Sequence, residues 1–324
     1  MFYLGIDISK DSFDVALLSA DQRWRGQFSN DAPGFVKLAR WLKKRRVDEL
    51  HACMEATNRY WEALALFLTD EGHQVSVVNP KLIKRHAEAT MQRNKTDAQD
   101  ALTIADYCAK QQPDLWKPPS AAQRELKVMA RHLQALKADR QRERNRQKSG
   151  LSSAPVLEAI ERHIAFLEDQ IAELEERIQD HIDQHPDLKR DKELLQSIPG
   201  VGPIVAATFL AEVPHVANFA QARQVAAYAG LTPGEHHSGS SIHRPGKLVK
   251  WGNAHLRTVF YMPALSAHLH NTIVRNLKER LEARGKSKMT VIVAAMRKLL
   301  HLCYGVLKTR KPFQENHALN AQLT

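Results

Sequence analysis

The 324-residue sequence predicts an α/β domain followed by a helical coiled-coil connector and an all-α C-terminal domain. Strand and helix patterns alternate in roughly the first 100 residues. Apolar residues then recur at heptad spacing, and from Leu194 short helical patterns alternate with Gly and Pro. These changes of pattern place the predicted domain boundaries at residues 1–118, 119–190 and 191–324.

The first domain opens with three strand patterns. Apolar residues alternate from Phe2 to Ile8 as one buried face of a strand, and Ser12–Leu18 is predicted to follow after a short polar turn. Arg23–Phe28 completes a meander.

Helices and strands then alternate. We expect helices over Gly34–Lys44 and Arg59–Thr69, and strands over Leu50–Met54, which ends in Glu55, and Gln74–Val78. Three early strands followed by this alternation is the order of a ribonuclease-H-like α/β fold.

The connector carries an apolar seam. Leu, Ile and Met recur at three- and four-residue spacing from Leu126 to Leu136 and again from Leu157 to Ile178, with a break at Ser149-Gly150. A helical hairpin packed within one chain would show this pattern, but so regular a seam more often pairs subunits. Pro186 ends it.

The charge balance indicates a polyanionic partner. There are 47 Lys and Arg against 36 Asp and Glu, a net charge of +11 with an isoelectric point near 9.6. Residues Ala121–Gly150 hold nine basic and three acidic side chains, and Glu158–Glu193 reverses this balance; Asn271–Pro312 is basic again. Nucleic acid is the simplest partner for such segregated basic runs.

Other classes of protein are disfavoured. The three cysteines show no metal-ligand or disulfide spacing, and the N-terminus lacks the basic and apolar regions of a signal peptide. We find no apolar run of the roughly 18–20 residues that a membrane span needs. We therefore expect a cytoplasmic protein with no membrane partner.

Four carboxylates suggest a catalytic site. Asp7 projects from the opposite face of the first strand to the apolar residues, and Glu55 closes a neighbouring strand. Asp97 and Asp100 share one face of a helix. Together they would form an oxygen-only site for two Mg²⁺ ions about 3.5–4 Å apart. Each alone also fits a structural role, such as Asp97 at a helix N-terminus.

A polar loop at residues 238–241 precedes a run of cations. Ser238 lies beside a glycine, and nearby cations would hold a phosphate. From the residues alone, a Ser/Gly loop is more often only a loop. The candidate nucleic-acid contacts are Arg244, Lys247, Lys250 and Arg257 after this loop, and Arg140, Arg142, Arg144 and Arg146 in the connector.

Several motifs together resemble those of DEDD-type insertion-sequence transposases. In the first domain they are GIDISKDSFDVALL, CMEATNRYW, VSVVNP and RNKTDAQDA; later come LLQSIPGVGP, AAYAGLTPG and HSGSSIHRPGKLVKWGNAHLR. The resemblance covers nearly the whole chain. The family is related to pilin-gene inversion recombinases and includes bridge-RNA-guided recombinases.

The resemblance implies a RuvC-like first domain whose acidic tetrad is Asp7, Glu55, Asp97 and Asp100, and a nucleophilic serine at Ser238. It further implies a covalent phosphoserine intermediate, with the site shared between subunits of a homodimer or homotetramer. It also implies a structured guide RNA that base-pairs with donor and target DNA.

The sequence therefore predicts a DNA transposase that excises and integrates an insertion sequence by Mg²⁺-dependent strand exchange. A metal-dependent junction resolvase, in which water attacks and Ser238 is inert, is the nearest alternative. A nonenzymatic nucleic-acid-binding protein is another. A sugar kinase of the actin-like superfamily shares the opening strand pattern, but a second glycine-rich phosphate hairpin is absent from the sequence.

Overall fold

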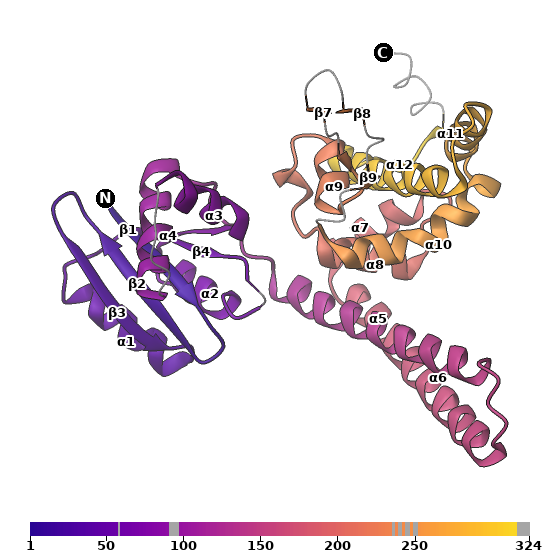
Figure 1. Cartoon of the computed structure of the whole chain (residues 1–324), viewed down its shortest axis with the longest axis horizontal. Coiled ribbons are helices and arrows are strands. Elements are labelled where there is room, and N and C mark those ends of the chain that lie inside the picture. Colours follow the sequence, from indigo (N-terminus) through magenta and orange to yellow (C-terminus); the bar gives the residue numbers. More distant parts are fainter. Residues whose placement is uncertain are drawn as a thin grey trace. The chain divides into compact units, whose positions relative to one another are not determined.

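The computed structural model describes residues 1–57, 59–90, 97–234, 237–238, 242–243, 247–248 and 252–315. It divides into two compact units, Met1–Pro118 and Pro119–Thr324, which we describe separately (Figure 1). The first unit is α/β and the second is mostly helical.

The first unit contains a five-stranded mixed sheet in the order β3-β2-β1-β4-β5. β1, β4 and β5 are parallel, and β2 runs antiparallel to β1 and to β3. The elements are β1 (Phe2–Ile8), β2 (Ser12–Leu18), β3 (Arg23–Ser29), α1 (Ala32–Lys43), β4 (Leu50–Glu55), α2 (Glu62–Asp70), β5 (Gln74–Val78), α3 (Pro80–Ala89) and α4 (Asp97–Gln111). All five strands predicted from the sequence are confirmed.

Both predicted helices are confirmed with shifted starts. α1 begins two residues early because the Asp31 side chain caps it, accepting a hydrogen bond from Gly34 N at 2.8 Å. α2 begins at Glu62 rather than at Arg59. The Asn30 side-chain amide donates a hydrogen bond to the carbonyl of Tyr60, two residues before α2, at 3.1 Å.

The two faces of the sheet carry different residues. Leu4 and Ile6 on β1 pack into an apolar core with Leu38 of α1 and Leu64 of α2. The opposite face approaches α4 so closely that a Cβ on Gly5 would lie 2.1 Å from the Ala101 carbonyl oxygen. Only glycine fits there, and this contact fixes α4 against β1.

The second unit consists of helices around one core and a small arm, which is the segment between α9 and α10 that carries the short strands β6 to β9. Its elements are α5 (Ala121–Gln147), α6 (Ala154–Asp183), α7 (Pro186–Gln196), α8 (Pro203–Glu212), a 3₁₀ turn (Val216–Asn218), α9 (Ala222–Tyr228), β6 (Pro233–Gly234), β7 (His237–Ser238), β8 (Ile242–His243), β9 (Lys247–Leu248), α10 (Ala254–His270), α11 (Thr272–Ala283) and α12 (Lys288–Thr309).

The heptad seam packs within the chain. α5 and α6 form a long hairpin (Figure 1), and Ile171 and Ile178 of α6 share a core with Leu126 and Leu133 of α5. The intrachain alternative therefore accounts for these seam residues. Pairing of subunits through the connector stays a prediction.

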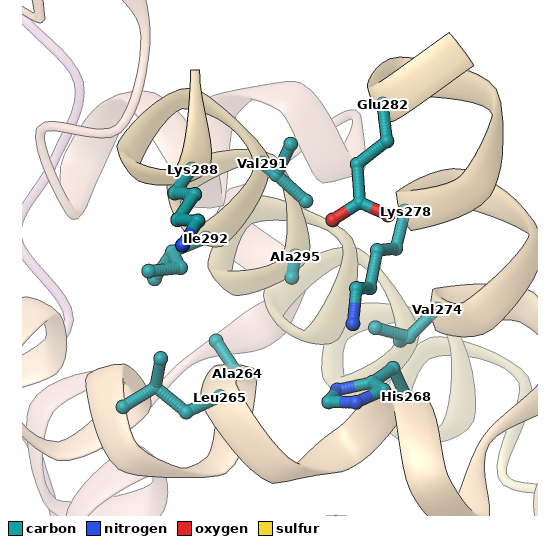
Figure 2. A pocket seen from close by; sticks show the side chains of 10 residues that line it. All are labelled: Ala264, Leu265, His268, Val274, Lys278, Glu282, Lys288, Val291, Ile292 and Ala295. Carbon is teal, nitrogen blue, oxygen red and sulfur yellow. The ribbon is translucent and has the colours of Figure 1, made fainter. Parts of the chain in front are cut away.

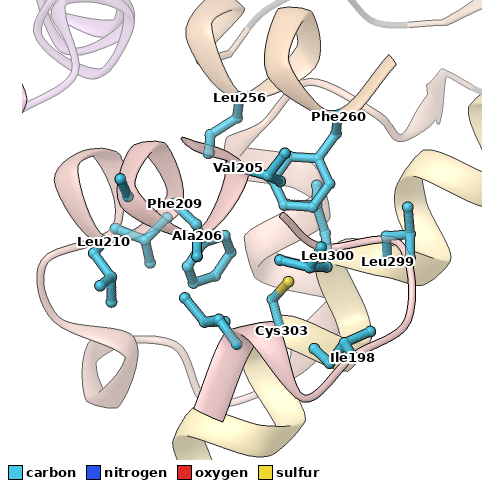
Figure 3. Packing of buried hydrophobic residues seen from close by; sticks show 14 of the residues in the cluster. Ile198, Val205, Ala206, Phe209, Leu210, Leu256, Phe260, Leu299, Leu300 and Cys303 are labelled. Carbon is cyan, nitrogen blue, oxygen red and sulfur yellow. The ribbon is translucent and has the colours of Figure 1, made fainter. Parts of the chain in front are cut away.

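The core of the second unit is centred on α8, α10 and α12 (Figure 3). Phe209 and Phe260 meet edge to face with ring centroids 6.2 Å apart, and Cys303 is fully buried. α12 is the one helix among the described residues that is long and apolar enough to span a membrane, which the sequence analysis did not anticipate. Half of its apolar window is buried in this core, as in a central helix of a globular unit.

Candidate active site

Asp7 and Glu55 lie side by side where the inner strands β1 and β4 end, at the carboxyl-terminal edge of the sheet. β1 and β4 are parallel with Ile6 opposite Met54, so the next residue of each strand occupies the same level. Adjacent strands are about 4.8 Å apart, and neighbouring residues of a parallel pair share a face. Both side chains are half-buried. The fold thus brings together two carboxylates that are far apart in the sequence.

The first turn of α4 adds two more carboxylates, Asp97 and Asp100. Burial raises the pKa of Asp7 to about 6, and the negative charges of nearby carboxylates add to this rise. In order of effect these are Asp100, Asp97 and Asp14. Two members of the predicted tetrad are therefore within electrostatic reach of Asp7, and Glu55 lies beside it by strand register.

Asp14 was missed by the sequence analysis. It lies on β2 directly opposite Asp7, and the Gln27 side chain donates to its Oδ2 at 3.1 Å. The signal was present in the sequence, because a tight meander that pairs Ile8 with Phe13 also pairs Asp7 with Asp14. A fifth carboxylate therefore borders the site.

The donor chemistry fits a hard divalent cation. The clustered side chains offer only carboxylate oxygens, the ligands that Mg²⁺ prefers, and their mutual repulsion is what a cation would relieve. Among the residues that the structure describes, no three or more His, Cys, Asp or Glu side chains lie close enough together to hold a metal ion. The carboxylates are neighbours, but they do not yet form a closed ligand set.

Ser238 lies in the arm of the second unit. It ends β7, whose backbone pairs with β8 so that Ser238 is opposite Ile242 and His237 is opposite His243 in the register. Closer to the helices, β6 pairs with β9, with Pro233 opposite Leu248. Lys247 is in β9, whereas Arg244 and Lys250 lie outside the described residues.

The predicted nucleic-acid contacts have intrachain partners at several positions. Arg142 pairs with Asp139, Arg146 with Glu143 at 3.2 Å, and Arg144 with Glu168 of α6. Arg140 is half-buried on the same helix.

Charge pairing across the hairpin also explains part of the segregation in the sequence. Lys137 of α5 pairs with Glu175 of α6 at 2.6 Å, so the acidic run of α6 compensates for the basic run of α5. Beyond the hairpin, Arg257 donates to the Ala229 carbonyl at 2.9 Å, which gives it a structural role at the base of the serine arm.

A cavity of about 240 Å³ lies between α10, α11 and α12 (Figure 2). Its floor is apolar, formed by residues such as Val274, Val291 and Ile292, and Lys278 and Glu282 stand at its edge. The sequence analysis did not anticipate it, because its walls come from three separate helices.

Two family models match the chain. Residues 4–154 match a model of DEDD-type transposases, described as "Transposase", and residues 192–279 match "Transposase IS116/IS110/IS902 family". The protein is therefore a transposase, an enzyme that acts on DNA. Its α/β unit carries the clustered carboxylates, and the second model matches part of its helical unit.

Relatives cover almost the full length. The pilin gene-inverting proteins of Moraxella bovis and Moraxella lacunata are each 34% identical over 97% of this chain and 98% of theirs. The transposase for insertion sequence element IS1111A of Coxiella burnetii is 25% identical over 90% of this chain and 86% of its own. The chain belongs to the IS110 family of DEDD transposases.

Proposed function

We propose that this transposase exchanges DNA strands through a covalent phosphoserine intermediate at Ser238, with Mg²⁺ held by Asp7, Glu55, Asp97 and Asp100. The observation that carries the proposal is the strand register that sets Asp7 beside Glu55, with Asp97 and Asp100 nearby in the first turn of α4. The raised pKa of Asp7 accords with this clustering of carboxylates. The DEDD-type match suggests dependence on a divalent metal. The strand order β3-β2-β1-β4-β5 supports a ribonuclease-H-like, RuvC-like assignment for this unit.

The side chains of this edge have distinct tasks in the proposal. Bound cations would lower the free energy of the charge that develops on the scissile phosphate. Glu55 and Asp7, on rigid strands, fix one side of the site, and the first turn of α4 supplies the other side. Because α4 is locked to β1 at Gly5, the two sides keep a fixed spacing.

The Ser238 hydroxyl is the proposed nucleophile. Its oxygen forms a bond to the scissile phosphorus as the bond to one deoxyribose oxygen breaks, and that oxygen leaves with a proton. The phosphodiester energy is kept in the phosphoserine. A deoxyribose hydroxyl of the new partner strand then attacks the phosphorus, and the serine oxygen leaves.

We further propose donor and target DNA, a structured guide RNA and a second subunit as partners, in a homodimer or homotetramer acting in the cytoplasm. The names of the Moraxella relatives refer to inversion of a pilin gene. Inversion and transposition both require the strand exchange proposed here. The net charge of +11 supports nucleic-acid binding.

The acidic site is tested by recombination of a plasmid that carries the coding sequence with its native flanking DNA. Glu55→Gln and Asp97→Asn should abolish strand exchange, because each replaces an anionic ligand by an amide of similar volume. Asp70→Asn, at the exposed end of α2, is the matched control and should recombine normally. Normal recombination by either tetrad variant would remove it from the metal site.

The serine is tested by isolating protein–DNA adducts after denaturation. Ser238→Ala should bind DNA and RNA but form no adduct, whereas Ser240→Ala should retain some. An adduct peptide that maps elsewhere would move the nucleophile. Strand cleavage with no adduct in the unaltered protein would favour the water-using resolvase.

The guide RNA is tested by comparing RNA-loaded and RNA-free protein in the same recombination assay. The loaded protein should recombine DNA and the free protein should not. Equal activity would reject the RNA, and binding of nucleic acid without any strand transfer would favour the nonenzymatic alternative.

A further inference from the structure

The arm that bears Ser238 leaves and rejoins the helices at one narrow neck. Asn253 N donates to the Tyr228 carbonyl at 2.7 Å. A Cβ on Gly252 would lie 2.5 Å from Gly230 N. The chain between Gly230 and Gly252 therefore starts and ends at the same place, and only glycine permits this approach of the two backbones.

A buried charge lies directly beneath this neck. Glu212, at the end of α8, is 2% exposed. It accepts two hydrogen bonds from Arg131 of α5, Nε to Oε1 at 2.6 Å and Nη2 to Oε2 at 2.9 Å. Asn253 Nδ2 donates to Oε2 at 2.6 Å. The carboxylate thus links α5 and α8 to the first residue after the neck.

Asn253 has two separate roles. Its Oδ1 caps α10 by accepting from Leu256 N at 3.1 Å, while its Nδ2 reaches Glu212 and lies 3.5 Å from the Tyr228 hydroxyl. A second link runs nearby, because His255 Nδ1 and Gln134 Oε1 of α5 are 2.7 Å apart. The start of α10 is therefore joined to α5 directly through His255, and through Glu212 of α8 at Asn253.

Burying an ion pair seldom adds to stability over apolar packing, so its presence needs another explanation. Breaking one partner, in contrast, leaves an uncompensated buried charge. Such a cluster is well suited to allow one orientation of the neck and to disfavour the others. We propose that Arg131, Glu212 and Asn253 are positioning residues that set the orientation of the Ser238 arm for attack on DNA.

The geometry of the arm shows why orientation at the neck matters. Ser238 is eight residues beyond Gly230 and lies on the outer of the two strand pairs. Eight extended residues span at most about 29 Å, so a 10° tilt at the neck would displace a group about 20 Å away by about 3.5 Å. A misplacement of about 1 Å of a reacting group lowers a rate by about 100-fold.

This inference rests on Ser238 as the proposed nucleophile, and its test separates the two. Asn253→Ser and Asn253→Asp both keep an oxygen to cap α10. The first replaces the amide that donates to Glu212 by a shorter hydroxyl, and the second sets two carboxylates against each other. Glu212→Gln/Asn253→Asp exchanges donor and acceptor, because the amide at 212 then donates to the carboxylate at 253. Tyr304→Phe is the matched control, since it removes a hydroxyl that donates at 3.0 Å to two carbonyls elsewhere in the unit.

Two readouts are needed. The first is functional and uses duplex DNA from the native flanks and RNA transcribed from them. It gives the single-turnover rate of adduct formation at Ser238 and the Kd of the protein for this DNA and RNA. The second is hydrogen exchange of the backbone amides of β6–β9, which requires no activity. Both Asn253 variants should slow adduct formation by about 10- to 100-fold with Kd within about twofold, and should speed exchange. The double variant should recover part of the rate that Asn253→Asp loses, because it removes the repulsion between the two carboxylates but leaves Arg131 with an amide in place of its carboxylate partner.

Several results would overturn the proposal. They are an adduct rate in Asn253→Asp within about twofold of the unaltered protein, an equal loss of rate in Tyr304→Phe, or unchanged exchange in β6–β9. If the unaltered protein forms no adduct at Ser238, the proposed function fails, and exchange alone then decides whether the neck orients the arm.

Discussion

Replacing Asp7 by Asn should stabilise the metal-free protein. The pKa of Asp7 is raised from 3.8 to about 6, by burial first and then by Asp100, Asp97 and Asp14. The folded state therefore binds a proton more tightly than the unfolded state. The stabilisation that comes from protonated Asp7 is fully present below pH 3.8 and is lost as the pH rises through about 6.

The magnitude follows from the shift. One pKa unit corresponds to about 1.4 kcal/mol, so roughly two units give about 3 kcal/mol at pH 7 as an upper limit. Because the side chain is only half-buried, solvent screening reduces this to about 1–2 kcal/mol. Asp7→Asn should recover that amount, since a neutral amide does not repel its neighbours.

The assay is urea unfolding of the full chain in EDTA, followed by tryptophan fluorescence. Four of the five tryptophans, Trp24, Trp41, Trp61 and Trp116, are in the first unit, so the signal reports mainly on that unit. Added Mg²⁺ should stabilise the unaltered protein and act much less on Asp7→Asn.

Asp31→Asn is a control of opposite sign. Hydrogen bonds from Ser29 and Gly34 lower the pKa of Asp31, so its stabilising effect is present at neutral pH and is lost as the pH falls through the folded pKa. Asp31→Asn should therefore not stabilise the protein. If Asp7→Asn lowers or does not change the free energy of unfolding in EDTA, the electrostatic reasoning about this edge is wrong.

Three further predictions concern packing and binding. Gly252→Ala should lower the free energy of unfolding by more than about 2 kcal/mol, because its Cβ would overlap the Gly230 backbone. Gly285→Ala, with open space around it, should lower it by about 1 kcal/mol from its positive φ alone. Thermal unfolding monitored by circular dichroism compares the two variants. In urea unfolding, Phe209→Ala should lower the free energy of unfolding by about 3–5 kcal/mol. Phe166→Ala, at an exposed position, should lower it by less than about 0.5 kcal/mol, and equal losses would contradict the assigned core. The affinity for RNA should fall steeply between about 50 and 200 mM salt in filter binding, and a flat salt dependence would argue against phosphate contacts.

The strands of the first unit were predictable because their signals are local. Alternation from Phe2 to Ile8 and the boundaries of Gln74–Val78 need no information beyond neighbouring residues. The starts of α1 and α2 were less predictable. The start of α1 depends on the cap that the Asp31 side chain provides. The Trp61 N-cap of α2 has no side-chain cap hydrogen bond that its sequence could signal.

The partners of the charged residues could not be predicted from the sequence. The sequence showed a basic and an acidic run, but not that α5 and α6 fold back so that Arg144 meets Glu168. A run of like charge is therefore as consistent with a partner inside the chain as with a nucleic acid. Likewise, α12 has the composition of a membrane span, and its burial among the helices of the second unit is a property of the packing.

The sequence by itself determined the types of residue and their local setting: a carboxylate on the first strand, another closing the fourth, a pair in one helical turn, and the motifs that mark the family. Only the tertiary structure decided which of them meet. Strand register puts Asp7 beside Glu55 and opposite Asp14, and the close approach at Gly5 turns the start of α4 toward them. Similarly, Arg131 in α5, Glu212 in α8 and Asn253 at the N-cap of α10 are far apart in the sequence and share no motif. Their contact exists because the helices pack, and long-range packing depends on the whole set of buried surfaces rather than on any local stretch of chain.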